Sequence, residues 1–158
     1  METAETATSF FLHPGGLLAQ KAGCTVTTIL GSCVAVCLVD PVLKIGGINH
    51  YMLALWNGEG LPSPRYGNIA IAKLIEKMLS LGSRKENLRA KIFGGGDVIR
   101  TADNFFSIGR RNIFIAEDLL REERIPIVTG DVGGKFGRKL IFNSESGRVM
   151  VKKINKHL

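Results

Sequence analysis

The sequence is poor in cysteine, histidine and aromatic residues, and it contains no long apolar run. Its 158 residues include three cysteines, three histidines and one tryptophan, and aromatic residues make up only 7%. Three thiols cannot all pair within one chain, which is typical of a protein kept in a reducing compartment. No apolar stretch approaches the roughly 18–20 residues that a membrane helix needs. We therefore expect a protein without membrane insertion whose thiols can stay free.

The N-terminus lacks the features of a secretory signal. Residues 1–5 carry two glutamates where a signal peptide is basic, and Pro14 closes a short apolar stretch at residues 10–12. We therefore expect a cytoplasmic protein. The apolar fraction of 45% and the charged fraction of 22% are ordinary for a globular protein and exclude a disordered chain. The length predicts one domain over residues 1–158.

Positive charge is concentrated in two segments. The formal net charge is +7, and residues 83–111 and 135–158 contribute +4 and +6, whereas residues 112–134 contribute −3. A basic surface attracts nucleic acid, anionic lipid or an acidic protein. The chain lacks the interleaved aromatic residues of a single-strand binder and any zinc-finger or RNP-like motif. We therefore expect no nucleic-acid partner, and a solvated basic face is the simpler interpretation.

Hydrophobic periodicity predicts more strands than helices. Helical spacing of apolar residues predicts one helix from residue 68 to Gly82, after a loop at 57–67, and a second from an N-capping Asn112. Residues 33–39 are apolar on both faces, which fits a buried strand or a short helix. Further strands are predicted at residues 25–30, 45–55, 88–93, 125–129, 139–142 and 149–154, the last two as a hairpin. Because strands often follow one another directly, we expect the α+β class and not a doubly wound sheet.

Cys33 has the most reactive setting among the three cysteines. It follows Gly31 and Ser32 directly after an expected strand, where glycine lets the backbone turn and present successive N–H groups. Such donors stabilise a thiolate and can hold an oxyanion after the thiolate attacks a carbonyl, so the backbone at Gly31 and Ser32 is a candidate oxyanion hole. Cys37 and Cys24 lack this setting, and we expect Cys37 to be buried in the hydrophobic core. A small buried hydrophobe is the alternative role for Cys33.

His50 is the only histidine inside an apolar, structured segment. It lies 17 residues after Cys33, and the two segments are expected to pair across a turn at residues 40–44. Antiparallel neighbours can bring a nucleophile and a base within hydrogen-bond reach despite that separation. A core histidine satisfied by hydrogen bonds is the alternative for His50. A third group would orient the imidazole, and strand alternation puts Thr25 and Thr27 on one face of residues 25–30 and Thr28 on the other, which leaves the choice open.

Other constellations are weak. The segment from Gly130 to Lys135 resembles a phosphate loop but has the wrong spacing, and the cysteines match no usual zinc-ligand spacing. Asp97, Asp103 and Asp131 are too scattered for a metal site. We expect no cofactor and no metal, and we expect the glycine-rich segments 94–96 and 130–134 to be tight connections that pack near the site.

Several motifs resemble the CheD family of chemoreceptor glutamine deamidases. They are LGSCVAVCL at residues 30–38, DP at 40–41, GGINH at 46–50, AKIFGG at 90–95, IGRRN at 108–112, DVGG at 131–134 and GR at 137–138. The likeness runs in consistent order from about residue 10 to residue 154. It implies hydrolysis of glutamine side-chain amides on chemoreceptors to glutamate, with Cys33 as nucleophile, His50 as base and Thr27 as the residue that orients His50.

The resemblance also implies a fold and partners. The family fold is an α+β sandwich of mixed sheets with two main helices, similar to toxin-type glutamine deamidases. The expected partners are chemoreceptor helices, and many members of the family also bind a CheC-type phosphatase. The alternative function is a binding module that acts mainly by docking the phosphatase or the receptor. The chain departs from the family at Ala54, where many members have proline, and its loop at residues 55–65 is its own.

Overall fold

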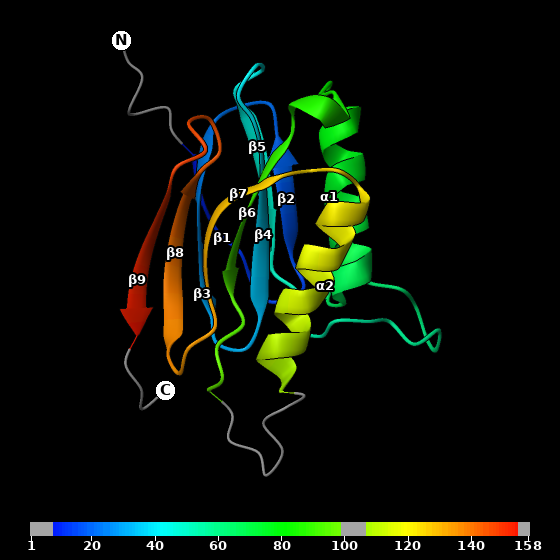
Figure 1. Ribbon diagram of the computed structural model, residues 1–158. Helices are drawn as coiled ribbons and strands as arrows, with labels where there is room; N and C mark the ends of the chain where they lie inside the picture. Colours follow the sequence, from blue (N-terminus) through cyan, green and yellow to red (C-terminus); the bar gives the residue numbers. More distant parts are fainter. Residues whose placement is uncertain (1–7, 99–106, 155–158) are drawn as a thin grey trace.

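Two β-sheets pack face to face, and two helices cover the outer face of one of them (Figure 1). The computed structural model describes residues 8–98 and 107–154. One sheet has the strand order β2-β5-β4-β6-β7 and lies next to the helices, whereas the other has the order β1-β3-β8-β9. Both sheets are mixed, because β1–β3 and β6–β7 are parallel and the other pairs antiparallel. The predicted α+β sandwich of mixed sheets with two main helices is confirmed.

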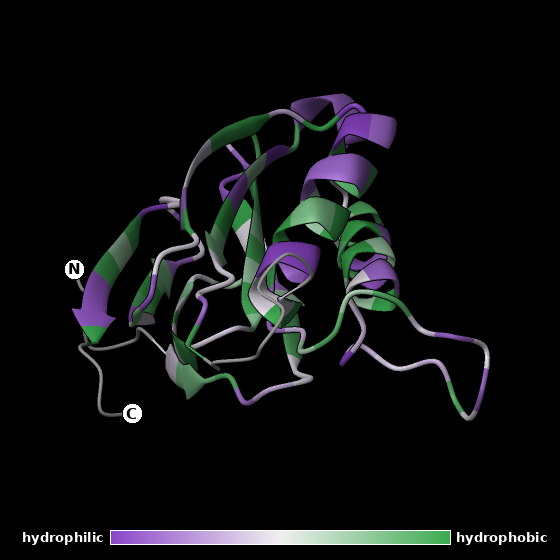
Figure 2. Ribbon diagram, turned by 60° about the horizontal axis from the view of Figure 1, so that its bottom comes forward, coloured by the Kyte–Doolittle hydropathy of each residue, from purple (hydrophilic) through white to green (hydrophobic). Residues whose placement is uncertain are grey.

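The elements follow one another with strands in the majority. The helices are α1 (Gly67–Ser80) and α2 (Ile108–Glu122), with a short 3-10 turn η2 (Lys85–Asn87) between them. The strands are β1 (Thr8–Phe11), β2 (Leu17–Gln20), β3 (Cys24–Leu30), β4 (Val34–Asp40), β5 (Ile45–Asn49), β6 (Arg89–Gly94), β7 (Ile127–Val132), β8 (Gly137–Asn143) and β9 (Val149–Ile154). The predicted hairpin is the β8–β9 pair. In Figure 2 both helices carry green and purple segments, as expected for helices that pack on one side only.

The apolar segment at 33–39 is a strand and not a helix. It forms β4, which pairs with β5 on one side and β6 on the other, at the centre of its sheet. Val34 and Val36 pack with the helices, while Ala35 and Cys37 pack with the other sheet. A strand with apolar packing on both faces shows no polar alternation, which explains the ambiguity of its sequence.

Two predictions for the N-terminal half need correction. The strand predicted at 45–55 ends at Asn49, because the Asn49 side-chain Oδ1 accepts the Val36 N–H at 2.8 Å and interrupts the ladder, which resumes only at the isolated bridge between Val34 and Tyr51. The short strands β1 and β2 were not predicted. Each has four residues, too few to show a clear period, and the turn at residues 12–16 separates them.

The second helix begins earlier than predicted, and Asn112 is not its N-cap. Ser107 caps α2, since its side chain accepts the Arg110 N–H at 3.3 Å, and Asn112 lies inside the helix with no exposed surface. Gly109, a poor helix former, conceals the first turn in the sequence. It is there because a Cβ at this position would lie 2.4 Å from the Gly95 carbonyl oxygen. The first helix matches the prediction, with Gly82 after its end at φ +110°.

Candidate active site

Cys33 lies in the loop at residues 31–33, which carries the chain from β3 in one sheet to β4 in the other. Its side chain is partly exposed. Strand alternation continues from Cys37 and Ala35 to Cys33, and all three pack with the cluster between the two sheets. The thiol therefore faces the inter-sheet space at its open end.

His50 faces the same space from the neighbouring segment. The antiparallel register that pairs Cys37 with Ile48 continues to the bridge between Val34 and Tyr51, which puts His50 opposite Ala35. Residues diagonal across such a pair lie about 7–8 Å apart at Cα, within reach of long side chains. The structure thus brings Cys33 and His50 to one face across the β4–β5 turn, although no hydrogen bond joins thiol and imidazole in the described residues. Such contacts often tighten only when substrate binds.

The hydrogen-bond partner of His50 is Thr28 and not Thr27. Thr28 Oγ1 lies 2.7 Å from His50 Nδ1, and no hydrogen bond involves the Thr27 hydroxyl within residues 8–98 and 107–154. The prediction that Thr27 orients His50 is therefore wrong. Thr28 shares the buried face of β3 with Val26 and Leu30, whereas Thr27 points to the partly exposed face. The sequence alternation could have indicated Thr28, because it is the one hydroxyl residue among the inward-facing residues of β3, which are otherwise Cys24, Val26 and Leu30.

The Thr28 hydroxyl fixes the tautomer of His50. Its single proton is donated to the Leu12 carbonyl oxygen at 2.7 Å, so towards His50 the hydroxyl oxygen can only accept. Nδ1 must therefore carry the ring proton, and Nε2 is left as the unprotonated nitrogen. Nε2 is buried and has no hydrogen-bond partner among the described residues. The imidazole is held with its basic nitrogen free.

Burial keeps both groups neutral at physiological pH. Desolvation lowers the pKa of His50 to about 4, with a smaller contribution from nearby His13. Desolvation also raises the pKa of the Cys33 thiol, against the opposing effect of a hydrogen bond from its own backbone N–H. The expected stabilisation of a thiolate is thus outweighed by burial. The resting pair is a thiol and a neutral imidazole, so an attack by the sulfur would need a base that takes the thiol proton.

The carbonyl groups of the Cys33 loop are all hydrogen-bonded. The oxygens of Gly31 and Cys33 accept the N–H groups of Gly96 and Gly95 at 2.9 and 2.8 Å, and the Ser32 oxygen accepts the side-chain amide of Asn112. None of the three loop N–H groups donates to another described residue. Across a trans peptide the C=O of one residue and the N–H of the next point in opposite directions, so bonding the Gly31 and Ser32 oxygens turns the Ser32 and Cys33 N–H groups to the other side of the loop. The N–H opposite the Cys33 oxygen belongs to Val34 and donates to the Tyr51 oxygen. The Ser32 and Cys33 N–H groups are therefore the candidate donors to an oxyanion.

The glycine segment at 94–96 packs against this loop, as predicted, whereas residues 130–132 of the other segment belong to strand β7 and are not a tight connection. Gly94 has φ +104°, and a Cβ there would lie 2.3 Å from the Cys33 carbonyl oxygen. The Gly133 N–H donates to the Gly94 oxygen, which stacks the second glycine segment on the first. Arg138, buried on β8, donates to Asp131 and to the Gly133 oxygen and holds this stack. Only glycine lets the backbones approach this closely.

The remaining candidates lie elsewhere. Cys37 is fully buried and its pKa is raised far above the ordinary thiol value by desolvation, and Cys24 is buried at the start of β3. In residues 8–98 and 107–154 no cluster of three His, Cys, Asp or Glu side chains has the arrangement of a metal site. Asp103 lies outside the described residues. No helix of the described chain is long and apolar enough to cross a membrane.

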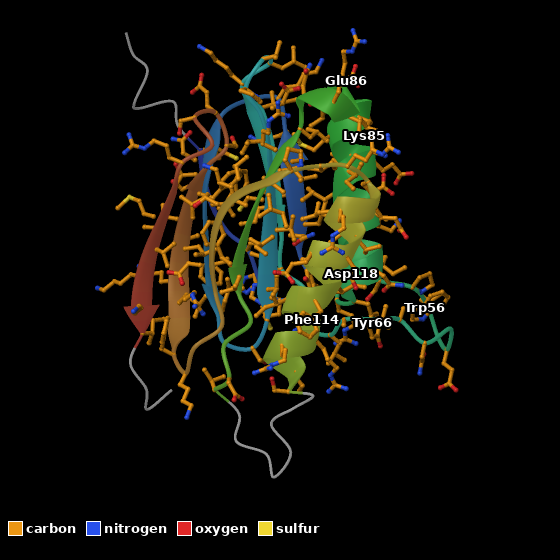
Figure 3. The ribbon with its side chains drawn as sticks, viewed as in Figure 1. Trp56, Tyr66, Lys85, Glu86, Phe114 and Asp118 are labelled. Carbon is orange, nitrogen blue, oxygen red and sulfur yellow. The ribbon has the colours of Figure 1, made fainter. Side chains whose placement is uncertain are left out.

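A surface pocket adjoins the loop after His50. It measures about 250 Å³ and is lined by Leu53, Ala54, Leu55, Ile108, Arg111 and Asn112. The loop that follows projects from the body beside the two helices, with Trp56 on it, and Phe114 lies on the outer side of α2 (Figure 3). The lining of the pocket is therefore mostly apolar, with one arginine and one asparagine.

Known proteins match the chain over most of its length. A sequence model of the family described as CheD chemotactic sensory transduction matches residues 53–153. A protein of Trichlorobacter lovleyi named "Probable chemoreceptor glutamine deamidase CheD" is 49% identical over 90% of this chain and 88% of its own length. One of the same name from Sulfurimonas denitrificans is 48% identical over 92% of this chain and 94% of its own. The chain belongs to the CheD family.

A third relative extends the match. "Probable chemoreceptor glutamine deamidase CheD 1" of Anaeromyxobacter dehalogenans is 42% identical over 91% of this chain and 84% of its own length. Cys33 and His50 precede the segment that the CheD family model covers, so that match says nothing of their roles. The sequence predicted that these two residues come together, left Thr28 as an alternative to Thr25 and Thr27, and gave no indication that Asn112 contacts the site. Asn112 lies at the head of a buried helical stripe with Ala116 and Leu120, a signal that was present in the sequence.

Proposed function

We propose that this CheD-family chain hydrolyses the side-chain amides of selected glutamines on chemoreceptor helices, giving glutamate and ammonia. The proposal rests on family membership and on one observation in particular. His50 is held by Thr28 in the tautomer whose free Nε2 faces the inter-sheet space that Cys33 also faces. A free basic nitrogen on the same face as a partly exposed thiol supports thiol-based acyl transfer.

The chemistry begins with a neutral pair. Cys33 Sγ attacks the carboxamide carbon while His50 Nε2 takes the thiol proton, and a C–S bond forms. The carbonyl oxygen becomes an oxyanion, which accepts the N–H groups of the Cys33 loop, including those of Gly31 and Ser32. The imidazolium then gives its proton to the departing nitrogen, the C–N bond breaks, and ammonia leaves a thioester on Cys33.

Water completes the turnover. His50 Nε2 takes a proton from a water molecule that attacks the thioester carbon, and the C–S bond breaks as the sulfur regains the proton. One water is consumed, one ammonia is released, and thiol and imidazole return to their neutral states. Each oxyanion donor contributes on the order of 2.7–4 kcal/mol to such a reaction. The unbonded N–H groups of the loop support this role.

The site is open on the side from which a protein substrate would approach. Cys33 is partly exposed while His50 is 1% exposed, so a glutamine side chain reaches the thiol before the imidazole. The pocket with Leu53, Leu55 and Ile108 offers apolar contact to residues beside the glutamine, and Arg111 offers charge. A net charge of +7 would speed encounter with an acidic receptor surface. The proposed place of action is the cytoplasm, where free thiols persist.

Intact-mass analysis of a purified receptor cytoplasmic fragment tests the proposal. Each hydrolysis replaces NH₂ by OH and adds about one mass unit. We expect this increase with the wild-type protein and none with Cys33→Ala. Cys37→Ala is the matched control, because it removes a thiol that lies buried in the core on β4, the strand that follows Cys33. An unmodified receptor with wild-type protein, or equal modification by Cys33→Ala, would contradict the proposal.

A second candidate function is docking of a CheC-type phosphatase. The leucines Leu53, Leu55 and Leu61 are 44%, 62% and 88% exposed on and after the segment that lines the pocket, which favours a protein contact. Binding of a CheC-type protein by Cys33→Ala as well as by the wild type, with loss on Leu55→Asp, supports this function. Absence of binding by the wild type rules it out.

A further inference from the structure

Asn112 links the two segments that carry Cys33 and His50. Its side-chain Nδ2 donates to the Ser32 oxygen at 2.9 Å and to the Met52 oxygen at 3.0 Å. Ser32 directly precedes Cys33, and Met52 follows His50 by two residues. One amide group on α2 therefore holds both segments at a fixed separation.

Simple packing does not explain an asparagine at this position. The side chain has no exposed surface, and its Oδ1 has no hydrogen-bond partner among the described residues. A buried acceptor without a partner costs about 1–3 kcal/mol. The other positions on this face, Gly109, Ala116 and Leu120, carry no polar side-chain group. The amide is retained at a cost in stability, which points to a role for its two donated hydrogen bonds.

The bond to Ser32 also sets the direction of a backbone donor. The Ser32 carbonyl and the Cys33 N–H belong to one trans peptide unit and point in opposite directions. When Asn112 holds the carbonyl towards α2, the N–H is turned to the other side of the loop. The Cys33 N–H donates no hydrogen bond to any other described residue. The orientation of a candidate oxyanion donor therefore depends on Asn112.

We propose that Asn112 is a positioning residue for the reaction: it keeps the Cys33 thiol beside His50 Nε2 and aims the Cys33 N–H at the substrate oxyanion. This inference rests on the proposed deamidase function. It assigns to Asn112 no contact with substrate. Misplacement of reacting groups by about 1 Å can cost on the order of a hundredfold in rate, so the expected loss without Asn112 is about tenfold to a hundredfold in kcat.

The kinetic test uses the full chain and a receptor fragment. Asn112→Ala should lower kcat by about tenfold to a hundredfold and leave KM within about twofold, because Asn112 lies at the base of the pocket with no exposed surface and the exposed pocket residues are unchanged. Tyr51→Phe is the matched control: it removes the hydroxyl that donates to the Asn112 main-chain oxygen but keeps the amide, and it should retain kcat. An unchanged kcat in folded Asn112→Ala, or an equal fall in Tyr51→Phe, overturns the inference.

A second readout does not need the receptor. Alkylation of Cys33 by iodoacetamide, followed by peptide mapping, should slow in Asn112→Ala and in His50→Ala. In the double variant the Asn112 change should add nothing, since Asn112 acts by keeping the pair together. Equal slowing by Asn112→Ala in both backgrounds would indicate a general structural effect and overturn the inference. If the wild type leaves the receptor unmodified, the proposed function fails, while the alkylation cycle still decides the role of Asn112.

A further variant tests the inference if Asn112→Ala fails to fold. If Asn112→Ala does not give a cooperative thermal transition, Asn112→Asp has the same shape and serves in its place. Its carboxylate cannot donate to Ser32 or Met52 at neutral pH, but the protonated acid can donate one hydrogen bond. The ratio of variant to wild-type alkylation rate should therefore rise as the pH is lowered. A pH-independent ratio overturns the inference.

Discussion

The two ends of strand β4 differ in whether the buried polar side chains near them are hydrogen-bonded. At the C-terminal end Asp40 is 1% exposed and both carboxylate oxygens are used. Oδ1 accepts the N–H groups of Val42 and Leu43 at 2.9 and 3.0 Å, and Oδ2 accepts the Ser83 hydroxyl at 2.7 Å. This end closes the turn to β5 and ties it to the segment after α1.

At the N-terminal end three buried side-chain atoms have no partner. They are Asn49 Nδ2, His50 Nε2 and Asn112 Oδ1, and they are all the unpartnered buried side-chain atoms of residues 8–98 and 107–154. Native proteins leave few such atoms, and each needs a reason. The contrast indicates that one end of the strand is built for stability and the other keeps hydrogen-bonding capacity for chemistry.

The largest expected effect is the loss of the base at the unsatisfied end. His50→Ala should lower kcat for receptor deamidation by about a hundredfold to ten-thousandfold, the usual contribution of a general acid–base group. The comparison variant is His13→Ala, which removes an exposed histidine near the site. Near-wild-type turnover by a folded His50→Ala protein would exclude His50 as the base.

A pH-dependent loss of stability should follow from the same histidine. In the folded protein the pKa of His50 is about 4, below its usual value near 6.5, so the unfolded chain binds a proton that the folded chain does not. Stability from neutral His50 is complete above pH 6.5 and falls as the pH drops towards 4, by up to about 3 kcal/mol. Urea unfolding at pH 7, 6 and 5 should show a steeper loss for wild type than for His50→Gln. Parallel curves would contradict the depressed pKa.

The sequence predicted that Cys33 and His50, the proposed reacting pair, come from neighbouring segments. Cys33 after a glycine-broken strand and His50 in a segment expected to pair with residues 33–39 were sufficient, because a short turn at residues 40–44 brings antiparallel neighbours together. The α+β class was predictable from the order of strands and helices. That order does not say which strands pair or how the two sheets pack, so the sandwich arrangement came from the resemblance.

The sequence did not predict which groups support the reacting pair. Thr28 and Asn112 meet the site from β3 and α2, and contacts between separate elements depend on packing that no local pattern encodes. For Thr28 the inward stripe of β3 was a usable signal. For Asn112 a local signal misled, since asparagine is a common N-cap and Gly109 hid the first turn of the helix. The error at Asn112 came from a local capping rule, whereas the choice of Thr27 came from the resemblance to the CheD family.

Substitution of the two adjacent threonines should show whether Thr27 or Thr28 orients His50. Thr28→Val removes the acceptor for His50 Nδ1–H and should lower kcat by about tenfold to a hundredfold through misorientation of the ring. Thr28→Ser keeps the hydroxyl and should restore most of the rate. Thr27→Val changes the partly exposed face of the same strand and should stay within about twofold of wild type. A larger loss for Thr27→Val than for Thr28→Val would return the orienting role to Thr27.

The smallest effect is expected at the satisfied end of β4, and it should fall on stability alone. Asp40→Ala removes the acceptor for two backbone N–H groups and the Ser83 hydroxyl, which should lower the free energy of unfolding by about 1–3 kcal/mol. Asp40→Asn keeps an oxygen for the N–H groups and an amide that can donate to Ser83, so most of the loss should be recovered. Urea unfolding measures both variants, and kcat of the folded fraction should match wild type in each, because the turn lies at the far end of the strand from Cys33. A fall in kcat with unchanged stability would mean that the two ends of β4 are coupled, and the division between a stabilising end and a reactive end would not hold.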